Sequence, residues 1–145
     1  MNMATAATVT KTLGHAGRLR ILAMLRAGPM SVCQMATVLD TAVSTISGHL
    51  LRLRHAGLVR EQRRGKWVYY RLTEVEPIAS VVACVLTAVG ETSEIRRDTA
   101  RAVRLRRTSS AASCDPGEAE DAHDDTPDRS RTAAAGWTAP RKSLC

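Results

Sequence analysis

Residues 39–72, LDTAVSTISGHLLRLRHAGLVREQRRGKWVYYRL, decide the fold of this chain. Ile46, Leu50 and Leu53 recur at helical spacing, so they share one face of a helix that we expect over residues 42–55. The opposite face carries the small or polar residues Ser44, Thr45, Gly48 and Arg52. One face of this helix is therefore suited to packing, and the other is left open to a partner.

After Gly57 the pattern changes from helical to alternating. In the segment WVYYRL, at residues 67–72, the side chains at odd positions would share one face of a strand and those at even positions the other. This is how a half-buried strand distributes its side chains. The sequence Arg63-Arg64-Gly65-Lys66 precedes it, and the glycine supplies the positive φ that a tight hairpin needs. Cations at the tip of a hairpin favour contact with phosphate. A helix, a corner and a basic hairpin together predict a winged helix that reads DNA.

Three shorter helices are expected before this stretch, over residues 3–13, 16–27 and 31–39. Gly28-Pro29 ends the second, because proline cannot continue a helix. Ser31 with Gln34 predicts a capping box at the start of the third. Helices 31–39 and 42–55 then form a helix-turn-helix, with Thr41 or Asp40 expected to cap the second helix.

The strongest amphipathic pattern follows the hairpin, after Pro77. Its apolar positions are Ile78, Val81, Val82, Val85, Leu86 and Val89. A stripe of this kind predicts a dimer seam, in a helix that is expected to continue to about Arg107. The predicted fold class is mainly α with a β-hairpin wing, a winged helix-turn-helix that dimerises through its terminal helices.

The charge divides the 145 residues into two parts. Residues 1–107 hold 17 Lys and Arg against 7 Asp and Glu, whereas residues 108–145 hold 4 against 7, which accounts for the net charge of +7. We expect a DNA-binding and dimerisation domain over 1–107 and a disordered acidic tail over 108–145. No apolar run approaches a membrane span and the start lacks a signal peptide, so we expect a cytoplasmic protein.

The four cysteines match neither a zinc pattern nor a disulfide framework, and they are expected to be free thiols: Cys33, Cys84, Cys114 and Cys145. Cys33 falls at position N2 of its helix, near the positive end of the helix dipole, where a thiolate is favoured. No phosphate loop, nucleophile with a base or Cys-x-x-Cys appears, so we expect neither an enzyme nor a required cofactor.

Several segments resemble the ArsR/SmtB family of metal-sensing repressors, and its arsenic branch in particular, across about residues 11–90. They are Arg18–Leu22, Ser44–Ser47 with His49-Leu50, Ala56–Val59 and Gly65–Leu72. The resemblance implies a homodimer that binds an inverted repeat in operator DNA and is released by an inducer. Base or phosphate contacts are then expected from Ser44, Thr45, Ser47, Arg52, Arg63, Arg64 and Lys66.

The arsenic branch often has Cys-Val-Cys near the start of the helix before the recognition helix, and this chain has Ser31-Val32-Cys33. Arsenite or antimonite would therefore need thiolates from elsewhere, and the predicted ligands are Cys33, Cys84 and Cys114. Two alternatives remain open at this point. One is a thiol redox or persulfide signal, and the other is a different soft metal such as Cd, Hg or Cu(I).

Overall fold

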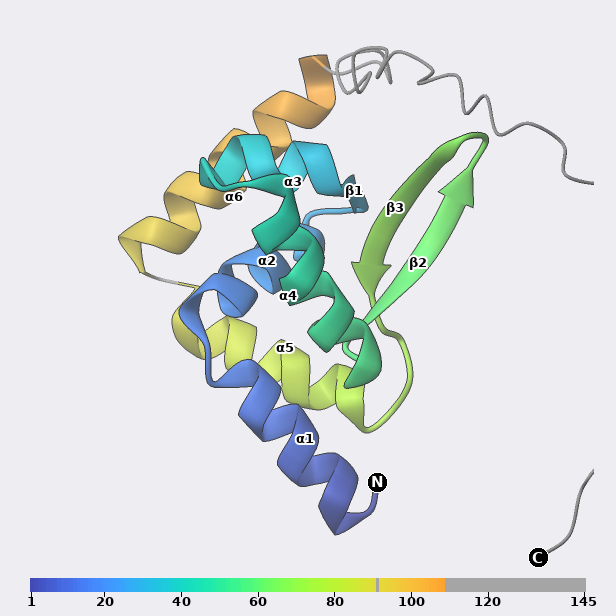
Figure 1. The fold of residues 1–145 in the computed structure, drawn as a ribbon. Helices are drawn as coiled ribbons and strands as arrows, with labels where there is room; N and C mark the ends of the chain where they lie inside the picture. The colour runs from blue at the N-terminus through green and yellow to red at the C-terminus, as the bar shows by residue number, and fades with distance from the viewer. Residues whose placement is uncertain (91, 109–145) are drawn as a thin grey trace, which may run out of the picture. The chain divides into compact units, whose positions relative to one another are not determined.

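The computed structural model describes residues 1–90 and 92–108. The chain divides into two units, Met1–Cys114 and Asp115–Cys145, and every described residue belongs to the first. Its elements are α1 (Met3–Leu13), α2 (Ala16–Arg26), β1 (Met30–Ser31), α3 (Val32–Leu39), α4 (Val43–His55), β2 (Val59–Arg64), β3 (Trp67–Leu72), α5 (Ile78–Val89) and α6 (Ser93–Thr108) (Figure 1). The tail predicted over 108–145 lies outside the described residues, apart from Thr108 at the end of α6.

Helix α2 supplies the centre of the core. Ile21, Leu22 and Met24 are completely buried, and α2 packs against α1, α4, α5 and α6. Arg18, at the start of α2, donates from Nε to the carbonyl of Thr12 at 2.5 Å and from Nη2 to that of Lys11 at 3.2 Å. These bonds satisfy carbonyl groups at the end of α1, which otherwise lack partners within the helix. The guanidinium thus fixes α1 against the start of α2.

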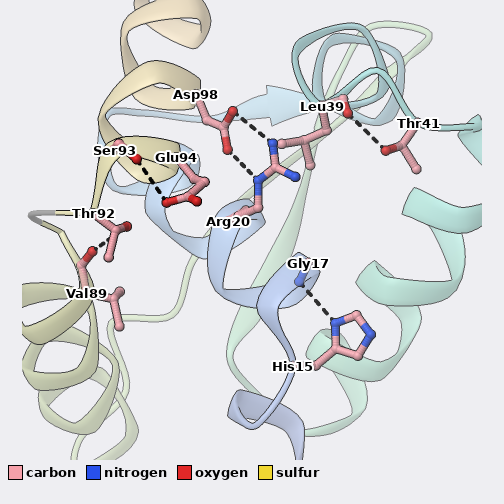
Figure 2. Close-up of polar contacts among 10 residues, drawn as sticks. All are labelled: His15, Gly17, Arg20, Leu39, Thr41, Val89, Thr92, Ser93, Glu94 and Asp98. Atoms are coloured by element: carbon pink, nitrogen blue, oxygen red, sulfur yellow. Dashed lines mark hydrogen bonds and ion pairs between the residues drawn. The ribbon is translucent and has the colours of Figure 1, made fainter.

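The capping box predicted for α3 is confirmed. Ser31 Oγ accepts from the backbone N–H of Gln34 at 3.3 Å, and Gln34 Oε1 accepts from the N–H of Ser31 at 2.9 Å. The cap predicted for α4 is wrong. Asp40 adopts a left-handed conformation that ends α3, and the hydroxyl of Thr41 donates back to Leu39 (Figure 2). Ala42 is therefore the N-cap of α4, which has no side-chain cap.

The hairpin predicted after Gly57 is confirmed, with Arg64 opposite Trp67 and a turn at Gly65, whose φ is 60°. The sheet has a third strand that the sequence did not reveal. The two residues of β1 pair with β3, which places β3 in the middle of the order β1-β3-β2. The pairing joins the middle of β3 to the segment that starts α3.

The continuous helix expected from Pro77 to about Arg107 is wrong. Helix α5 ends at Val89, α6 starts at Ser93, and the two are bent by 111°. The hydroxyl of Thr92 donates to the carbonyl of Val89 at 2.9 Å, which satisfies a group at the end of α5 (Figure 2). Beyond the break, α6 folds back to pack against α2 and α3 (Figure 1).

A bidentate ion pair ties α6 to α2. Arg20 Nε and Nη2 donate to the two carboxylate oxygens of Asp98 at 2.6 and 3.0 Å (Figure 2). The Asp98 side chain is 1% exposed and that of Arg20 32% exposed. The hydrogen bonds to Asp98 raise the pKa of Arg20, against the opposing effect of its burial. A charge pair of this geometry fixes the register of α6 on the core.

The apolar stripe of α5 packs partly within its own chain, and the dimer seam predicted along it stays a prediction. Val82 and Leu86 are buried, and the other four positions of the stripe pack half-buried against the core. Among the described residues, no single helix is long and apolar enough to span a membrane; α5 and α6 meet the length and composition criteria only together, as a bent pair.

Candidate nucleic-acid interface and thiol sites

Helix α4 has one packed face and one open face. Ile46, Leu50 and Leu53 are buried to 1% exposure or less, as their spacing predicted. The open face carries the first four predicted contact residues, all exposed: Ser44, Thr45, Ser47 and Arg52. Gly48 lies among them, and a Cβ placed there would meet nothing within 4 Å. The flat patch at Gly48 lets a large surface approach the helix backbone.

The hairpin carries the other three predicted contact residues, and all of them are exposed: Arg63, Arg64 and Lys66. The guanidinium carbon of Arg64 lies 5.4 Å from the ring centre of Tyr69, and Lys66 Nζ lies 5.2 Å from that of Trp67. The rings of Tyr69 and Trp67 therefore form cation–π contacts with Arg64 and Lys66, and these contacts restrict the conformations of the two cationic side chains. A group of preordered positive charges at a hairpin tip is suited to phosphate.

A hydrogen-bond network connects α4 to the hairpin, and sequence reasoning missed it. Glu61 Oε1 accepts from Arg54 Nη1 of α4 at 2.5 Å and from the hydroxyl of Tyr70 at 3.1 Å. Burial and the neighbouring Glu61 carboxylate raise the pKa of Tyr70. The sequence did hold one signal of this network. Glu61 is the single acid within the strand VREQRR, and a carboxylate among cations suggests that it pairs with one of them. Glu61 thus connects the wing to α4 through hydrogen bonds at the surface.

A second cluster joins α4 to the start of α2. The rings of His15 and His49 lie 4.8 Å apart between centres, and His15 Nδ1 accepts from the N–H of Gly17 to cap α2 (Figure 2). A Cβ on Gly17 would lie 3.2 Å from His49 Nε2, so the glycine permits this approach. Burial lowers the pKa of His49, and the charges of His15, Arg18 and Arg52 lower it further. His49 is half-buried in this cluster, whereas His15 is exposed.

The two thiols within the described residues lie on different helices. Cys33 is half-exposed at position N2 of α3, and Cys84 is exposed on α5. Helix α3 lies on one side of α2 and α4, and α5 lies on the other (Figure 1). Within residues 1–90 and 92–108, no three His, Cys, Asp or Glu side chains gather as metal ligands. The third predicted ligand, Cys114, lies outside the described residues, as does Cys145.

Comparisons with known proteins agree with this arrangement. Residues 15–61 match the model of the family described as "Bacterial regulatory protein, arsR family". The arsenic resistance transcriptional regulator ArsR1 of Pseudomonas putida is 42% identical over 65 residues, which are 44% of this chain and 51% of that protein. The chain thus spans about half the length of this curated relative.

Two solved structures share the fold over most of their length. The transcriptional repressor BigR from Xylella fastidiosa is 32% identical, with a TM-score of 0.54 over 61% of this chain and 88% of that one. The homodimeric winged helix-turn-helix domain of Mb0332 from Mycobacterium bovis, a possible ArsR-family regulator, is 33% identical, with a TM-score of 0.55 over 63% and 83%. By its sequence and by its winged helix-turn-helix fold, the chain belongs to the ArsR family of bacterial regulatory proteins.

Proposed function

We propose that this protein is a transcriptional repressor that binds an inverted repeat in double-stranded operator DNA as a homodimer. The observation that carries the proposal is the joint exposure of the polar face of α4 and the cationic tip of the hairpin, on elements whose other faces are buried. A helix of this width enters a major groove, and a hairpin beside it reaches the flanking backbone. Hydrogen bonds from Arg54 and Tyr70 to Glu61 connect the two.

The seven exposed residues divide by chemistry. Arg63, Arg64 and Lys66 are placed to neutralise phosphate, which gives affinity without sequence preference. Ser44, Thr45 and Ser47 present hydroxyl groups to base edges, and Arg52 presents a guanidinium that favours guanine. Substituting the first group changes the salt dependence of binding, whereas substituting the second changes the preferred sequence.

The test measures the binding of the full chain to the DNA upstream of its own coding sequence, by fluorescence anisotropy over a range of salt concentrations. R63A/R64A is expected to lower the slope of log affinity against log salt by about one for each phosphate that the wing no longer neutralises. The matched control is R97A/R101A, which removes the same charge from exposed positions of α6. An equal change of slope in both variants contradicts the assignment of the wing.

For the inducer we propose trivalent arsenic or antimony, bound by thiolates that include Cys33. In support, Cys33 is half-exposed in the first turn of α3. Helix α3 is the element that precedes the corner leading into α4. The thiols described within one protomer do not complete a three-sulfur site, so the remaining ligands would come from Cys84 of a second protomer or from Cys114. Ligation that shifts α3 would change how α4 is presented to DNA.

The inducer test challenges the complex of protein and operator DNA separately with arsenite, antimonite, Cd²⁺, Hg²⁺ and polysulfide. Arsenite is expected to release wild-type protein, and C33S is expected to need a much higher dose. Release of C33S at the arsenite dose that releases the wild-type protein would contradict the role of Cys33. Release by polysulfide alone favours the redox signal, and release by Cd²⁺ or Hg²⁺ alone favours another soft metal.

A further inference from the structure

The fold-back of α6 creates a groove that the DNA-binding proposal does not use. It lies between the end of α2, the end of α5 and one side of α6, and its volume is about 780 Å³. Its apolar lining comes from Ala23, Ala27, Leu86, Ile95, Ala100 and Val103. Alanine on α2 leaves room that a larger side chain would fill, so the groove arises from the small size of these residues. Volumes of 300 to 1,000 Å³ are about the range that holds small organic ligands.

The charged lining of this groove has one sign. Arg26, Arg96, Arg104 and Arg107 contribute to it, and none of its described lining residues is acidic. The acid that α6 does turn toward the core, Asp98, is bound to Arg20. Arginine side chains bind carboxylate and other oxyanions through paired hydrogen bonds. An apolar surface bordered by arginines therefore complements a molecule with an apolar body and an anionic head.

A neighbouring guanidinium adds to the positive potential. Arg106 Nη1 is buried and has no hydrogen-bond partner within the described residues. It lies beside Gly28, 2.6 Å from where a Cβ would stand, directly after the groove residue Ala27. Burial lowers the pKa of Arg106. Burying a guanidinium nitrogen without a hydrogen-bond partner is costly, and a bound anion nearby would offset part of that cost.

We propose that the α2–α5–α6 groove is a binding site for a small amphipathic organic anion, such as a medium-chain carboxylate. The apolar body would lie on the alanine and valine side chains, and the carboxylate would meet Arg104 and Arg107. The site is separate from the wing and from Cys33, and it rests on neither DNA binding nor thiol chemistry. Because α2 also packs against α4, a ligand here would touch the helix that supports the recognition helix.

The experiment titrates the full chain, without DNA, with decanoate by isothermal calorimetry, and with the neutral analogue decanol for comparison. Decanoate is expected to bind with a dissociation constant below about 1 mM, and decanol about tenfold more weakly. R104A/R107A is expected to weaken decanoate binding about tenfold. The matched control R97A/R101A removes the same charge from α6 outside the groove and is expected to leave binding within about twofold of wild type.

A third variant, A100W, fills the groove without a change of charge. It is expected to abolish decanoate binding while the circular dichroism spectrum and the melting temperature stay near wild type. Equal losses in the two arginine pairs overturn the proposal, because they indicate diffuse charge attraction. Absence of decanoate binding to wild type at about 1 mM also overturns it. A dimerisation constant that changes in R104A/R107A, measured by sedimentation equilibrium, assigns the groove to a second copy of the chain instead.

Discussion

At the scale of single residues, the pair Arg20–Asp98 shows how unequal the two members of an ion pair can be. The Asp98 side chain is 1% exposed, whereas that of Arg20 is 32% exposed. If Asp98 is removed, the arginine still reaches water. If Arg20 is removed, a carboxylate is left in the core without its partner, and the desolvation cost is no longer offset.

We therefore predict that R20A destabilises the protein more than D98A does. R20A is expected to lower the free energy of unfolding by about 3 to 5 kcal/mol, the range for an uncompensated buried charge. D98A is expected to lower it by about 1 to 3 kcal/mol, the range for hydrogen bonds to a charged group. Urea denaturation followed by circular dichroism measures both.

The control for this prediction is E74A. Glu74 pairs with Arg71 at 2.6 Å, but its side chain is 81% exposed. Exposed pairs contribute less than about 1 kcal/mol, so E74A is expected to change stability by less than either variant of the buried pair. If D98A proves more destabilising than R20A, the assignment of the cost to the buried carboxylate is wrong.

His49 makes stability depend on pH. Burial lowers its pKa below the ordinary value of 6.5, and His15, Arg18 and Arg52 lower it further. The unfolded chain then binds a proton at this site more readily than the folded chain does, so protonation favours unfolding. The contribution is absent well above pH 6.5 and grows as the pH falls through 6.5 toward the folded pKa. We predict that H49Q reduces the loss of stability between about pH 7.5 and pH 5.

Urea denaturation at several pH values checks this slope, with H55Q as the matched control. His55 is exposed on the same helix, and the charges that surround His49 come from α2 and α4 at the packed junction. H55Q is expected to keep the wild-type slope. A slope in H49Q that equals the wild-type slope would show that His49 does not set the pH dependence.

At the scale of whole elements, α4 combines a well-packed face with an unprotected start. Ala42 is its N-cap and makes no side-chain cap. The N–H groups of a first turn that lack a cap bind anions readily, because they lie at the positive end of the helix dipole. In the proposed complex, DNA phosphate is the anion that would meet them.

We predict that A42S and A42D both stabilise the free protein but have different effects on DNA binding. Each supplies a cap and is expected to raise the free energy of unfolding by about 1 kcal/mol. A42D also places a negative charge where phosphate would approach, so it is expected to weaken operator binding more than A42S does. Urea denaturation and anisotropy titrations measure the two quantities. Equal DNA affinities in A42S and A42D would exclude a phosphate at this helix end.

The same elements show which features of the fold could be predicted from the sequence. The start of α3 was predictable because Ser31 and Gln34 are three residues apart and cap each other locally. The break after α5 was not predicted, because it depends on where α6 finds a surface to pack against, on α2 and α3. Glu61 was missed for the same reason, because its partners Arg54 and Tyr70 come from other elements.

For the candidate site, the exposed residues of α4 and the wing were predictable because each follows from its own helical or strand period. The surroundings of the thiols were not. The sequence places Cys33 and Cys84 on either side of the DNA-binding elements but does not say where α3 and α5 lie. Only the structure shows that α3 packs against α4 and α6, whereas α5 packs against α2.

At the scale of the whole molecule, the placement of α3 and α5 constrains any chemistry that joins their thiols. The main contacts of α3 are with α4 and α6, whereas α5 packs against α2. A disulfide requires Cα atoms within about 7 Å, so we expect a bridge between Cys33 and Cys84 to join two protomers. Mild oxidation of C114S/C145S protein, in which only these two thiols remain, tests this directly.

We predict that diamide converts this variant to a covalent dimer in which the peptides containing Cys33 and Cys84 are joined, as read by non-reducing electrophoresis and mass spectrometry. Adding C33S or C84S to the same background is expected to abolish this joined pair. A Cys33–Cys84 disulfide found in the monomer band would contradict the prediction, because we expect it to require α3 or α5 to leave its position on α4 and α6 or on α2. The monomer band therefore reports on whether α3 and α5 stay in place, and the dimer band on which two surfaces meet.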